Sequence, residues 1–456
     1  MLELMGRSGE AAPRRLRPYP EYRDAGIEWL GTIPSHWRTS RLRFVVETNS
    51  TKENVRHLDP HTEVSFVPME TVREYGGIDL SSVKPLADVI DGYTYFRDGD
   101  VILAKITPCF ENGKGALACG LCGGIGFGTT ELHVLRPSFD LNARFLLYLT
   151  FSDHFRRIGT ASMYGAGGQK RISDDFVRNF RHPIPSPAEQ HAIAAFLDRE
   201  TAKIDELVER KERLIELLLE KRSALITRAV TRGLDLDVSM EDSGVEWLGD
   251  VPAHWDVKRV KWVARMESGH TPDKKVEDYW DGDVPWVSLN DTHHLRDHDF
   301  IADTAYYTNE RGLENSSARL LPPRSVIFSR DATIGLCAIT ERAMAVSQHF
   351  IAWLCGNDIS PEYLVRVFDA MQDELQRLTA GATLRTIGMS DVRTLSTPVP
   401  PVDEQRTIVQ HIQQECLEVD QATAKIRHAI ALLNESRTAL ISAAVTGKID
   451  VRDATT

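Results

Sequence analysis

The sequence contains a unit of roughly 215 residues that is written twice. The segment 26–37, GIEWLGTIPSHW, recurs at 244–255 as GVEWLGDVPAHW, with eight of the twelve positions identical. The segment 183–190, PIPSPAEQ, returns 215 positions later, at 398–405, as PVPPVDEQ. Self-similarity over this length predicts two equivalent globular domains in place of a single continuous one.

A long helix is expected after each of the two proline-rich motifs. There is no proline or glycine between Pro187 and Gly233, nor between Pro401 and Gly447. Apolar residues recur in both stretches at steps of four and three, which is the signature of a coiled coil. At ~1.5 Å per residue, each helix would be roughly 65 Å long. Because both helices follow equivalent domains, we expect them to pack antiparallel about an approximate two-fold axis and to hold the domains apart.

The recurring apolar positions define the seam along which the two helices are expected to meet. Val208, Ile215 and Ile430 lie beside this seam and widen the apolar face, which leaves surface for further partners. The predicted seam residues are Ile193, Leu197, Ile204, Leu207, Leu214, Leu218 and Leu225 in the first helix and Ile408, Ile412, Val419, Leu433 and Leu440 in the second.

The segments between the repeated motifs have the pattern of mixed α/β domains. Strand-like runs stand between Gly, Pro and Asp turns, and helical patterns at 142–158 and 361–379 close each half. We therefore predict an α+β fold, with two similar mixed α/β domains separated by two long antiparallel coiled-coil helices. The expected divisions are a disordered N-terminal lead at 1–20, a first domain at 21–182, a spacer helix at 183–233, an acidic linker at 234–243, a second domain at 244–397, a second spacer helix at 398–447 and a tail at 448–456.

The net charge of -12 is unevenly distributed along the chain. Residues 234–250 include six acids and no lysine or arginine, whereas residues 144–181 include seven lysines and arginines against three acids. Neutralising DNA phosphates needs local positive charge, so this distribution permits DNA binding on selected faces.

Two equivalent loops have the residue types needed to read bases. Arginine or lysine pairs with guanine, and asparagine or glutamine pairs with adenine. The loops 165–171 (GAGGQKR) and 379–385 (TAGATLR) combine such side chains with glycines that let the backbone approach phosphates, and one apolar strand in each half ends on a basic residue. The alternative for each candidate is a solvated loop residue or a structural ion pair. The candidate DNA-binding residues are Lys105, Gln169, Lys170, Arg171, Arg330 and Arg385.

The duplicated E-W-L-G-x-[IV]-P-x-H-W opening resembles the start of target-recognition domains in the specificity subunits of Type I restriction–modification enzymes. The P-[IV]-P…E-Q motif that leads into a long helix ending R-x-A-L-I-x-x-A-V-T resembles the same family. In the second half, Thr271-Pro272, Tyr279-Trp280 and the segment 284–287 are similar to the family's T-P…Y-W-x-G-x-[IV]-P-W core. The first half departs from that core and has only the segment 66–68, FVP, in its place.

This resemblance implies a non-catalytic DNA-specificity subunit. Each domain would read one half of an asymmetric bipartite target in double-stranded DNA. The helices would bind two methyltransferase subunits and, through them, restriction subunits that act as translocase and nuclease. S-adenosylmethionine, ATP and Mg would then belong to these partners, and no cofactor is expected in this chain.

Motifs for catalysis and metal binding are missing from the sequence. There is no P-loop, no G-x-G-x-x-G and no [DN]-P-P-[YF] stretch of the amino-methyltransferase type. Cys119 and Cys122, with Cys109 and His133 nearby, are expected to be ordinary thiols and a histidine, not a zinc site, and the segment 291–299 (DTHHLRDHD) is expected to be a solvated loop. Six scattered cysteines and the lack of a long apolar run indicate a cytoplasmic protein without a membrane span.

Two other functions remain open from the sequence. The alternative within the same class is the specificity subunit of a Type IIB-like enzyme, in which the nuclease is fused to the methyltransferase. A coiled-coil adaptor whose globular halves bind proteins is the alternative from a different class.

Overall fold

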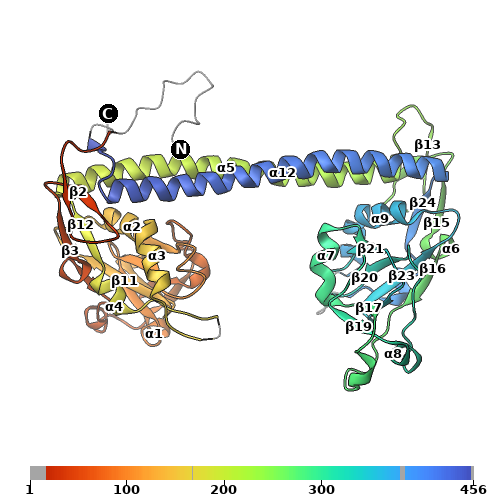
Figure 1. Ribbon diagram of the computed structural model, residues 1–456, viewed down its shortest axis with the longest axis horizontal. Helices are drawn as coiled ribbons and strands as arrows, with labels where there is room; N and C mark the ends of the chain where they lie inside the picture. Colours follow the sequence, from red (N-terminus) through yellow and green to blue (C-terminus); the bar gives the residue numbers. More distant parts are fainter. Residues whose placement is uncertain (1–16, 167, 380–385, 453–456) are drawn as a thin grey trace. The chain divides into compact units, whose positions relative to one another are not determined.

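The computed structural model describes residues 17–452 except for residue 167 and residues 380–385. It consists of two compact units, and each of them contains one part of each long helix (Figure 1). The first unit comprises residues 1–211 and 428–456, and the second comprises residues 212–427. The domains are therefore not divided from the helices as the sequence suggested, because each unit includes the helical segments on which it packs.

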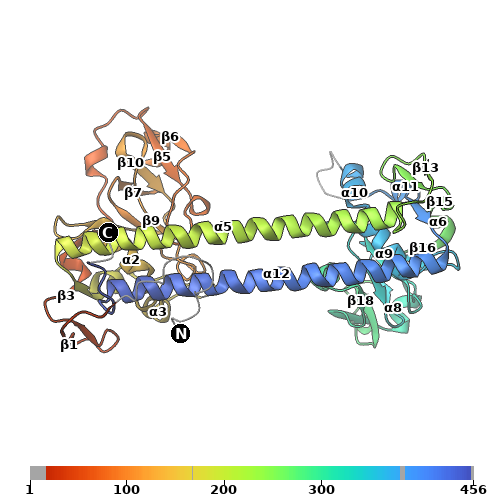
Figure 2. The ribbon, with the colours of Figure 1, turned by 90° about the horizontal axis from the view of Figure 1, so that it is seen from above.

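The two long helices begin and end where the prolines and glycines predicted. Helix α5 spans Pro187–Arg232 and helix α12 spans Val402–Val445. Gly233 and Gly447 follow the helices with φ of 71° and 73°, a left-handed conformation that glycine adopts without strain. Within each unit the segments of α5 and α12 lie side by side and run in opposite directions (Figure 2). The predicted α+β fold with antiparallel helices is confirmed.

The first unit contains two four-stranded sheets, with strand orders β6-β5-β10-β7 and β4-β11-β8-β9, and the two-stranded sheets β1-β2 and β12-β3. Its elements before α5 are β1 (Tyr22–Asp24), β2 (Thr32–Pro34), β3 (Arg38–Arg41), β4 (Val46–Thr48), β5 (Glu63–Val67), β6 (Val83–Pro85), α1 (Leu86–Val89), β7 (Thr94–Arg97), β8 (Val101–Ala104), β9 (Gly115–Leu117), β10 (Ile125–Gly128), β11 (Leu132–Pro137), α2 (Ala143–Phe151), α3 (Asp153–Ala161), α4 (Asp174–Asn179) and β12 (Arg181–Ile184).

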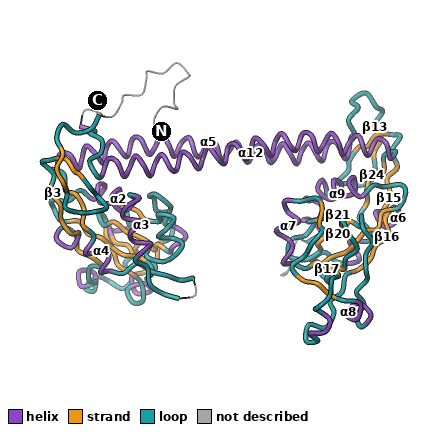
Figure 3. The backbone as a smooth tube through the Cα atoms, viewed as in Figure 1, coloured by secondary structure: helices purple, strands orange, loops and turns teal. Residues whose placement is uncertain are grey.

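The second unit has a five-stranded sheet of order β16-β23-β20-β21-β18, a three-stranded sheet of order β19-β17-β22 and two two-stranded sheets, β13-β14 and β15-β24 (Figure 3). Its elements before α12 are β13 (Met240–Asp242), β14 (Asp250–Pro252), β15 (Asp256–Arg259), α6 (Val260–Val263), β16 (Ala264–Ser268), β17 (Val284–Val287), α7 (Thr292–Asp297), β18 (Phe300–Ile301), β19 (Tyr306–Thr308), α8 (Glu310–Glu314), β20 (Val326–Ser329), β21 (Cys337–Thr340), β22 (Ala345–Val346), β23 (Phe350–Cys355), α9 (Pro361–Ala370), α10 (Gln372–Leu378), α11 (Met389–Val392) and β24 (Ser396–Val399).

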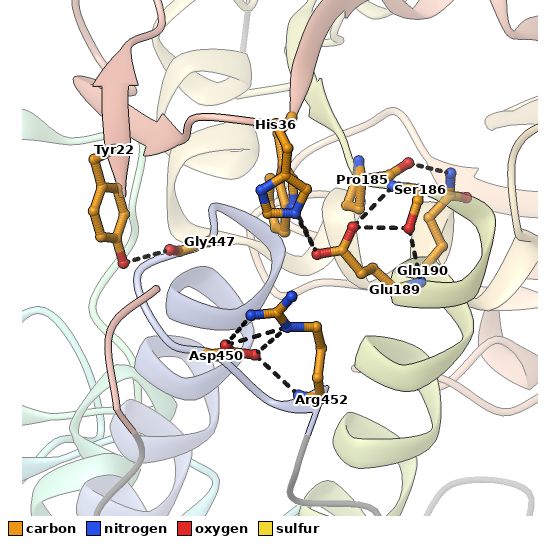
Figure 4. A network of polar contacts seen from close by, with 10 residues as sticks. Tyr22, His36, Pro185, Ser186, Glu189, Gln190, Gly447, Asp450 and Arg452 are labelled. Atoms are coloured by element: carbon orange, nitrogen blue, oxygen red, sulfur yellow. Dashed lines mark hydrogen bonds and ion pairs between the residues drawn. The ribbon is translucent and has the colours of Figure 1, made fainter. Parts of the chain in front are cut away.

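The repeated sequence motifs contact each other in the first unit (Figure 4). Glu189, in the first turn of α5, accepts a hydrogen bond from the Trp37 indole at 3.1 Å, and His36 Nε2 lies 2.8 Å from the same carboxylate. The neighbouring Gln190 donates to the carbonyl of Pro185 at 3.1 Å and accepts from the amide of Asn142 at 2.7 Å. The opening motif and the Glu-Gln motif therefore recur together because they form one polar network.

The second unit repeats this network through different residue numbers. His254 Nε2 lies 2.9 Å from Glu404, and Gln405 donates to the carbonyl of Pro400 at 2.9 Å. Gln405 also accepts from the amide of Ser360 at 2.9 Å, which fixes the residue that caps α9. The two units thus share the histidine–glutamate and glutamine contacts of this network, whereas the Trp255 indole, unlike that of Trp37, has no acceptor among the described residues.

The predicted helix seam is correct at most positions and wrong at two. Ile193, Leu197, Ile408 and Ile412 are fully buried, Val419 and Leu433 are buried, and Ile204, Leu218, Leu225 and Leu440 are half-buried. Leu207 and Leu214, by contrast, are 41% and 46% exposed.

The neighbouring residues Val208 and Ile215 take the half-buried places instead. Each residue advances about 100° around a helix, so of two adjacent apolar residues only one can face the partner helix. In α12 the positions equivalent to Leu207 and Leu214 are occupied by Ala422 and Ala429.

Three further expectations are corrected by the structure. Residues 17–20 belong to the folded first unit, since Tyr19 is 3% exposed and Arg17 forms a β-bridge with Asp450. The end of the acidic segment forms strand β13, which pairs with β14. The polar segment 291–299 is mostly helix α7 and not a loop, because Leu295 is buried beneath it in an apolar cluster.

No helix among the described residues is both long and apolar enough to cross a membrane.

Candidate nucleic-acid interface

In the first unit, the loop after β8 and the hairpin 164–171 form one surface. Arg171 makes β-bridges with both Ile106 and Tyr164. The Thr107 amide donates to the carbonyl of Lys170 at 2.9 Å, and the Thr107 hydroxyl accepts from the Lys170 amide at 2.9 Å. The structure therefore brings together four residues predicted to contact DNA: Lys105, Gln169, Lys170 and Arg171.

The glycines of this hairpin serve the turn itself. Gly165 has φ of 130°, and a Cβ at that position would lie 2.6 Å from the carbonyl oxygen of Gln169. Gly168 has φ of 79°, and its carbonyl accepts from the Thr107 hydroxyl at 2.8 Å. These two positions need glycine to close the hairpin, whether or not the backbone also approaches phosphates.

Arg171 forms an ion pair, whereas the side chains of Gln169 and Lys170 form none with the part of the chain that the structure describes. Its guanidinium donates to both oxygens of Glu131, at 2.9 and 2.8 Å, in a bidentate arrangement. The hydrogen bond from Arg171 lowers the pKa of Glu131 and raises that of Arg171. Gln169 and Lys170 are exposed, and among the described residues no group forms a hydrogen bond or ion pair with the side chain of either one or of Lys105. Three of the four residues therefore have side chains available for a ligand, and Arg171 chiefly stabilises the hairpin.

The second unit builds the same place from other side chains. Arg330, at the end of β20, accepts at its carbonyl from the amide of Ile387 at 3.0 Å, as Lys105 accepts from Ile172 at 2.9 Å. Asp331 bridges to Thr386, which stands where the first unit has Arg171. Lys105 and Arg330 are therefore structurally equivalent, as the sequence comparison predicted.

The polar groups beside Arg330 differ from those beside Lys105. His349 Nδ1 lies 2.8 Å from Asp331, and Gln348 Nε2 lies 3.2 Å from the other ring nitrogen of His349. The buried Nε of Arg330 has no hydrogen-bond acceptor among the described residues. Arg385 lies outside the described residues, so its placement stays a prediction. The two units thus present different chemistry at equivalent positions.

The family model described as the Type I restriction modification DNA specificity domain matches this chain twice, at residues 34–217 and 252–427. These two matches cover well over half of the sequence and coincide with the repeat. The chain belongs to this family. The resemblance that the duplicated motifs indicated is confirmed.

Among the most similar curated relatives are Type I specificity subunits from Escherichia coli. The chain is 37% identical to the EcoEI subunit over 196 residues, 41% of this chain and 32% of that protein. It is 36% identical to the EcoAI subunit over 215 residues, 45% of this chain and 36% of that protein. The aligned part of the chain thus spans about a third of these relatives.

Matches along almost the whole chain occur at lower identity. The putative MjaX specificity subunit of Methanocaldococcus jannaschii is 19% identical over 431 residues, 93% of this chain and 96% of that protein. A solved structure from work on complex assembly and conformational transition of the type I R-M system has a TM-score of 0.64 at 21% identity, covering 91% of this chain and 99% of that one. This likeness shows that the specificity-domain fold extends over nearly the whole chain.

Sequence reasoning did not identify the residues that lie next to the candidate DNA-binding side chains. Glu131, Asp331 and Gln348 were not among the predicted residues. A carboxylate next to a strand gives no local signal that it will pair with a hairpin 40 residues further along the chain. The matching of segments 129–133 and 346–349 is the one sequence feature that points to this place.

Proposed function

We propose that this chain is the DNA-specificity subunit of a Type I restriction–modification complex. In this function each unit reads one half of an asymmetric bipartite target in double-stranded DNA. The chain itself performs no catalysis and directs partner methyltransferase and restriction subunits to the target. S-adenosylmethionine, ATP and Mg are assigned to those partners, and the complex to the cytoplasm.

The observation that carries this proposal is the equivalence of Lys105 and Arg330 in a framework that the two units share, with different neighbouring side chains. Each basic residue directly follows a strand. Its backbone carbonyl accepts a hydrogen bond from the amide of an equivalent isoleucine, Ile172 in the first unit and Ile387 in the second. The residues that accept from the backbone amides of these two basic residues differ in side chain: Glu131, which pairs with Arg171, in the first unit and His349, which contacts Asp331, in the second. A reader of two unlike half-sites needs this combination, because base specificity resides in the side chains and not in the framework.

Exposed leucines on the long helices support the proposed contact with methyltransferase subunits. Large apolar side chains in contact with water are typical of surfaces that a partner covers. The exposed leucines are Leu207, Leu214, Leu217 and Leu219 on α5 and Leu417 and Leu432 on α12.

The decisive experiment is sequencing of methylated bases in a host that expresses the chain with its neighbouring methyltransferase. We expect methylated adenines within a bipartite, asymmetric motif, and their loss when the gene for this chain is deleted. Replacing residues 38–182 with those of another specificity subunit should change one half of the motif only. A motif unaffected by the deletion would contradict the proposal and favour a protein-binding adaptor. A partner in which nuclease and methyltransferase are fused would assign the chain to a Type IIB-like enzyme.

A further inference from the structure

The second unit has an aromatic cavity beside the three-stranded sheet. The DNA contact proposed for Arg330 does not involve this cavity. Its volume is about 820 Å³, and its walls include the rings of Trp280, Trp286, Tyr306 and Tyr307. A volume in this range is typical of sites that hold small organic groups.

The aromatic walls are fixed in place by hydrogen bonds. The Trp280 and Trp286 rings lie 4.9 Å apart at 79°. Their indole groups donate to the carbonyls of Asp273 and His270 at 3.2 and 3.1 Å. The Tyr306 hydroxyl accepts from the Asn290 amide at 3.1 Å. Because both indole N–H groups are already hydrogen-bonded, the tryptophan rings offer mainly their faces and edges to a ligand, whereas the Tyr306 hydroxyl keeps its hydrogen to donate.

Charged groups of both signs line the cavity, the Lys274 ammonium and the carboxylates of Glu277 and Asp281. The ammonium lies 5.9 Å from the centre of the Trp286 ring and is the group that can contact a phosphate. Glu277 and Asp281, which also line the cavity, can accept hydrogen bonds from amino groups on a ring edge. Stacking faces, acceptors for ring N–H groups and a nearby ammonium are together the requirements for binding a single nucleotide.

A chain of contacts connects this cavity to Arg330. The carbonyl that accepts from Trp286 belongs to His270, and the next residue, Thr271, donates to the Gln348 amide oxygen. Gln348 in turn lies beside His349, which pairs with Asp331, the residue after Arg330. These contacts place Arg330 and the cavity wall in one connected part of the second unit.

The corresponding segment of the first unit has other aromatic side chains. Phe66, which aligns with Trp286, has the Tyr93 ring at 5.0 Å and the Lys84 ammonium at 3.8 Å from its centre. The sequence there also lacks the Tyr-Trp pair found at 279–280. The Tyr-Trp pair thus distinguishes the second unit from the first.

We infer that this cavity receives one nucleobase that is extruded from the target duplex within the half-site read by the second unit. The inference rests on the proposed function, since it requires the chain to bind DNA. The base would stack on the Trp280 and Tyr306 rings, with its edge toward Asp281 and its phosphate toward Lys274. This base is different from any base that a methyltransferase subunit extrudes for catalysis.

The test uses the complete complex with its methyltransferase subunits and duplexes that contain the target. At each position of the second unit's half-site, the opposite nucleotide is replaced by an abasic analogue, which removes the cost of unpairing one base. We expect one position, apart from the methylated adenine, at which the wild-type complex binds about ten-fold more tightly. Tyr306→Ala should abolish this gain, and Tyr306→Phe should retain it because the ring remains. Tyr306 is 48% exposed, so its replacement should leave the unit folded.

Trp262→Ala is the matched control, since this tryptophan is 67% exposed and does not line the cavity. It should keep the gain, and Trp280→Ala should lose it. Target-specific binding with no position that gains, or a gain that persists in Tyr306→Ala, would overturn the inference while leaving the proposed function intact. Quenching of tryptophan fluorescence by tetramethylammonium in the absence of DNA would assign a cation site instead. Loss of target-specific binding in the wild-type complex would overturn both proposals.

Discussion

Trp37 donates its indole hydrogen to Glu189 at 3.1 Å, across 152 residues of chain. The bond ties the opening motif of the first unit to the first turn of α5. The carboxylate also accepts from the Ser186 hydroxyl at 2.8 Å. Burial opposes ionisation, but the hydrogen bonds from His36, Trp37 and Ser186 outweigh it and lower the pKa of Glu189. Glu189 in its ionised form thus connects the segment just before β3, the first turn of α5 and the Ser186 side chain.

Replacing Glu189 with alanine should therefore destabilise the first unit. A hydrogen bond to a buried charged group contributes about 1.5–3 kcal/mol, so we expect a loss of about 2–3 kcal/mol in the free energy of unfolding, measured by urea denaturation. Glu404→Ala is the control in the second unit. Its loss should be smaller, because the Trp255 indole has no acceptor among the described residues and only His254 contacts the carboxylate. Equal losses at both positions would contradict this account.

Lys170→Ala and Arg171→Ala should fail in different ways. Lys170 is exposed and faces solvent, so its loss should weaken DNA binding and reduce the slope of log affinity against log salt by about one, without changing the melting temperature. Arg171 pairs with Glu131, so its loss should lower the melting temperature, and Glu131→Gln should reproduce part of that effect. Filter binding across a salt series and calorimetry separate the two results. An unchanged salt slope for Lys170→Ala would exclude a phosphate contact.

Arg330→Ala should alter only one half of the methylated motif. A bidentate contact to a base discriminates by about 1–3 kcal/mol, so we expect relaxed specificity at one base pair read by the second unit. Arg330→Lys should retain affinity better than specificity, since it keeps the charge and loses the planar fork. Methylome sequencing of each variant is the measurement, with Lys105→Ala as the counterpart for the other half-site. A motif relaxed in both halves by a single substitution would show that the units do not read independently.

The stability of the first unit should depend on pH through His182. This histidine is fully buried on β12, its Nδ1 lies 2.9 Å from the Pro183 carbonyl, and burial lowers its pKa from 6.5 to about 4. The unfolded chain then binds a proton at a pH where the folded chain does not. Stability is therefore complete above pH 6.5 and falls as the pH drops toward 4, by up to about 3 kcal/mol.

The second unit supplies the control for this prediction. Thr397 occupies the equivalent position, is fully buried, and donates its hydroxyl to the Pro398 carbonyl at 2.9 Å. His182→Thr should remove this histidine's share of the pH dependence between 6.5 and 4 while preserving the fold. Thermal denaturation of the two proteins across that range is the measurement, and parallel curves would show that His182 is not responsible.

Leu207 and Val208 offer a direct test of the helix seam. Leu207→Ala should change the free energy of unfolding by less than about 0.5 kcal/mol, because Leu207 is an exposed surface residue. Val208→Ala, one residue further, should cost about 1 kcal/mol through lost packing against α12. If partner subunits cover the exposed leucines, Leu207→Ala should instead weaken assembly of the complex, measured by size-exclusion chromatography. A larger loss of stability for Leu207→Ala than for Val208→Ala would support the seam predicted from the sequence.

The long helices could be predicted because their signals are local. Spacing, proline and glycine lie within the segments that they describe, and the bounds of α5 and α12 follow from them. The choice between Leu207 and Val208 could not, since both are apolar and only the facing helix decides which one is buried. Helix α7 was missed for a similar reason, because Leu295 alone connects that polar segment to the core.

The structure brings the candidate DNA-contacting residues of the first unit together, and their contact with DNA stays a prediction. Arg171 looks like Lys170 in the sequence, and the difference arises from Glu131 on another segment. The aromatic cavity could not be predicted from the sequence, which showed its residues only as part of a family motif. The arrangement of Trp280, Trp286 and Tyr306 depends on the pairing of β17 with β19. Long-range pairing is the information that local patterns lack.

The division of the chain into its two units has a consequence for synthesis and for exchange of specificity. The second unit is contiguous, so it can fold as soon as residues 212–427 have been made. The first unit has to wait for residues 428–452, because Tyr22 donates to the Gly447 carbonyl and Arg17 bridges to Asp450. Two genetic crossovers, one within each long helix, would therefore exchange the complete second unit as a single segment. The first unit can be exchanged only as two separate segments.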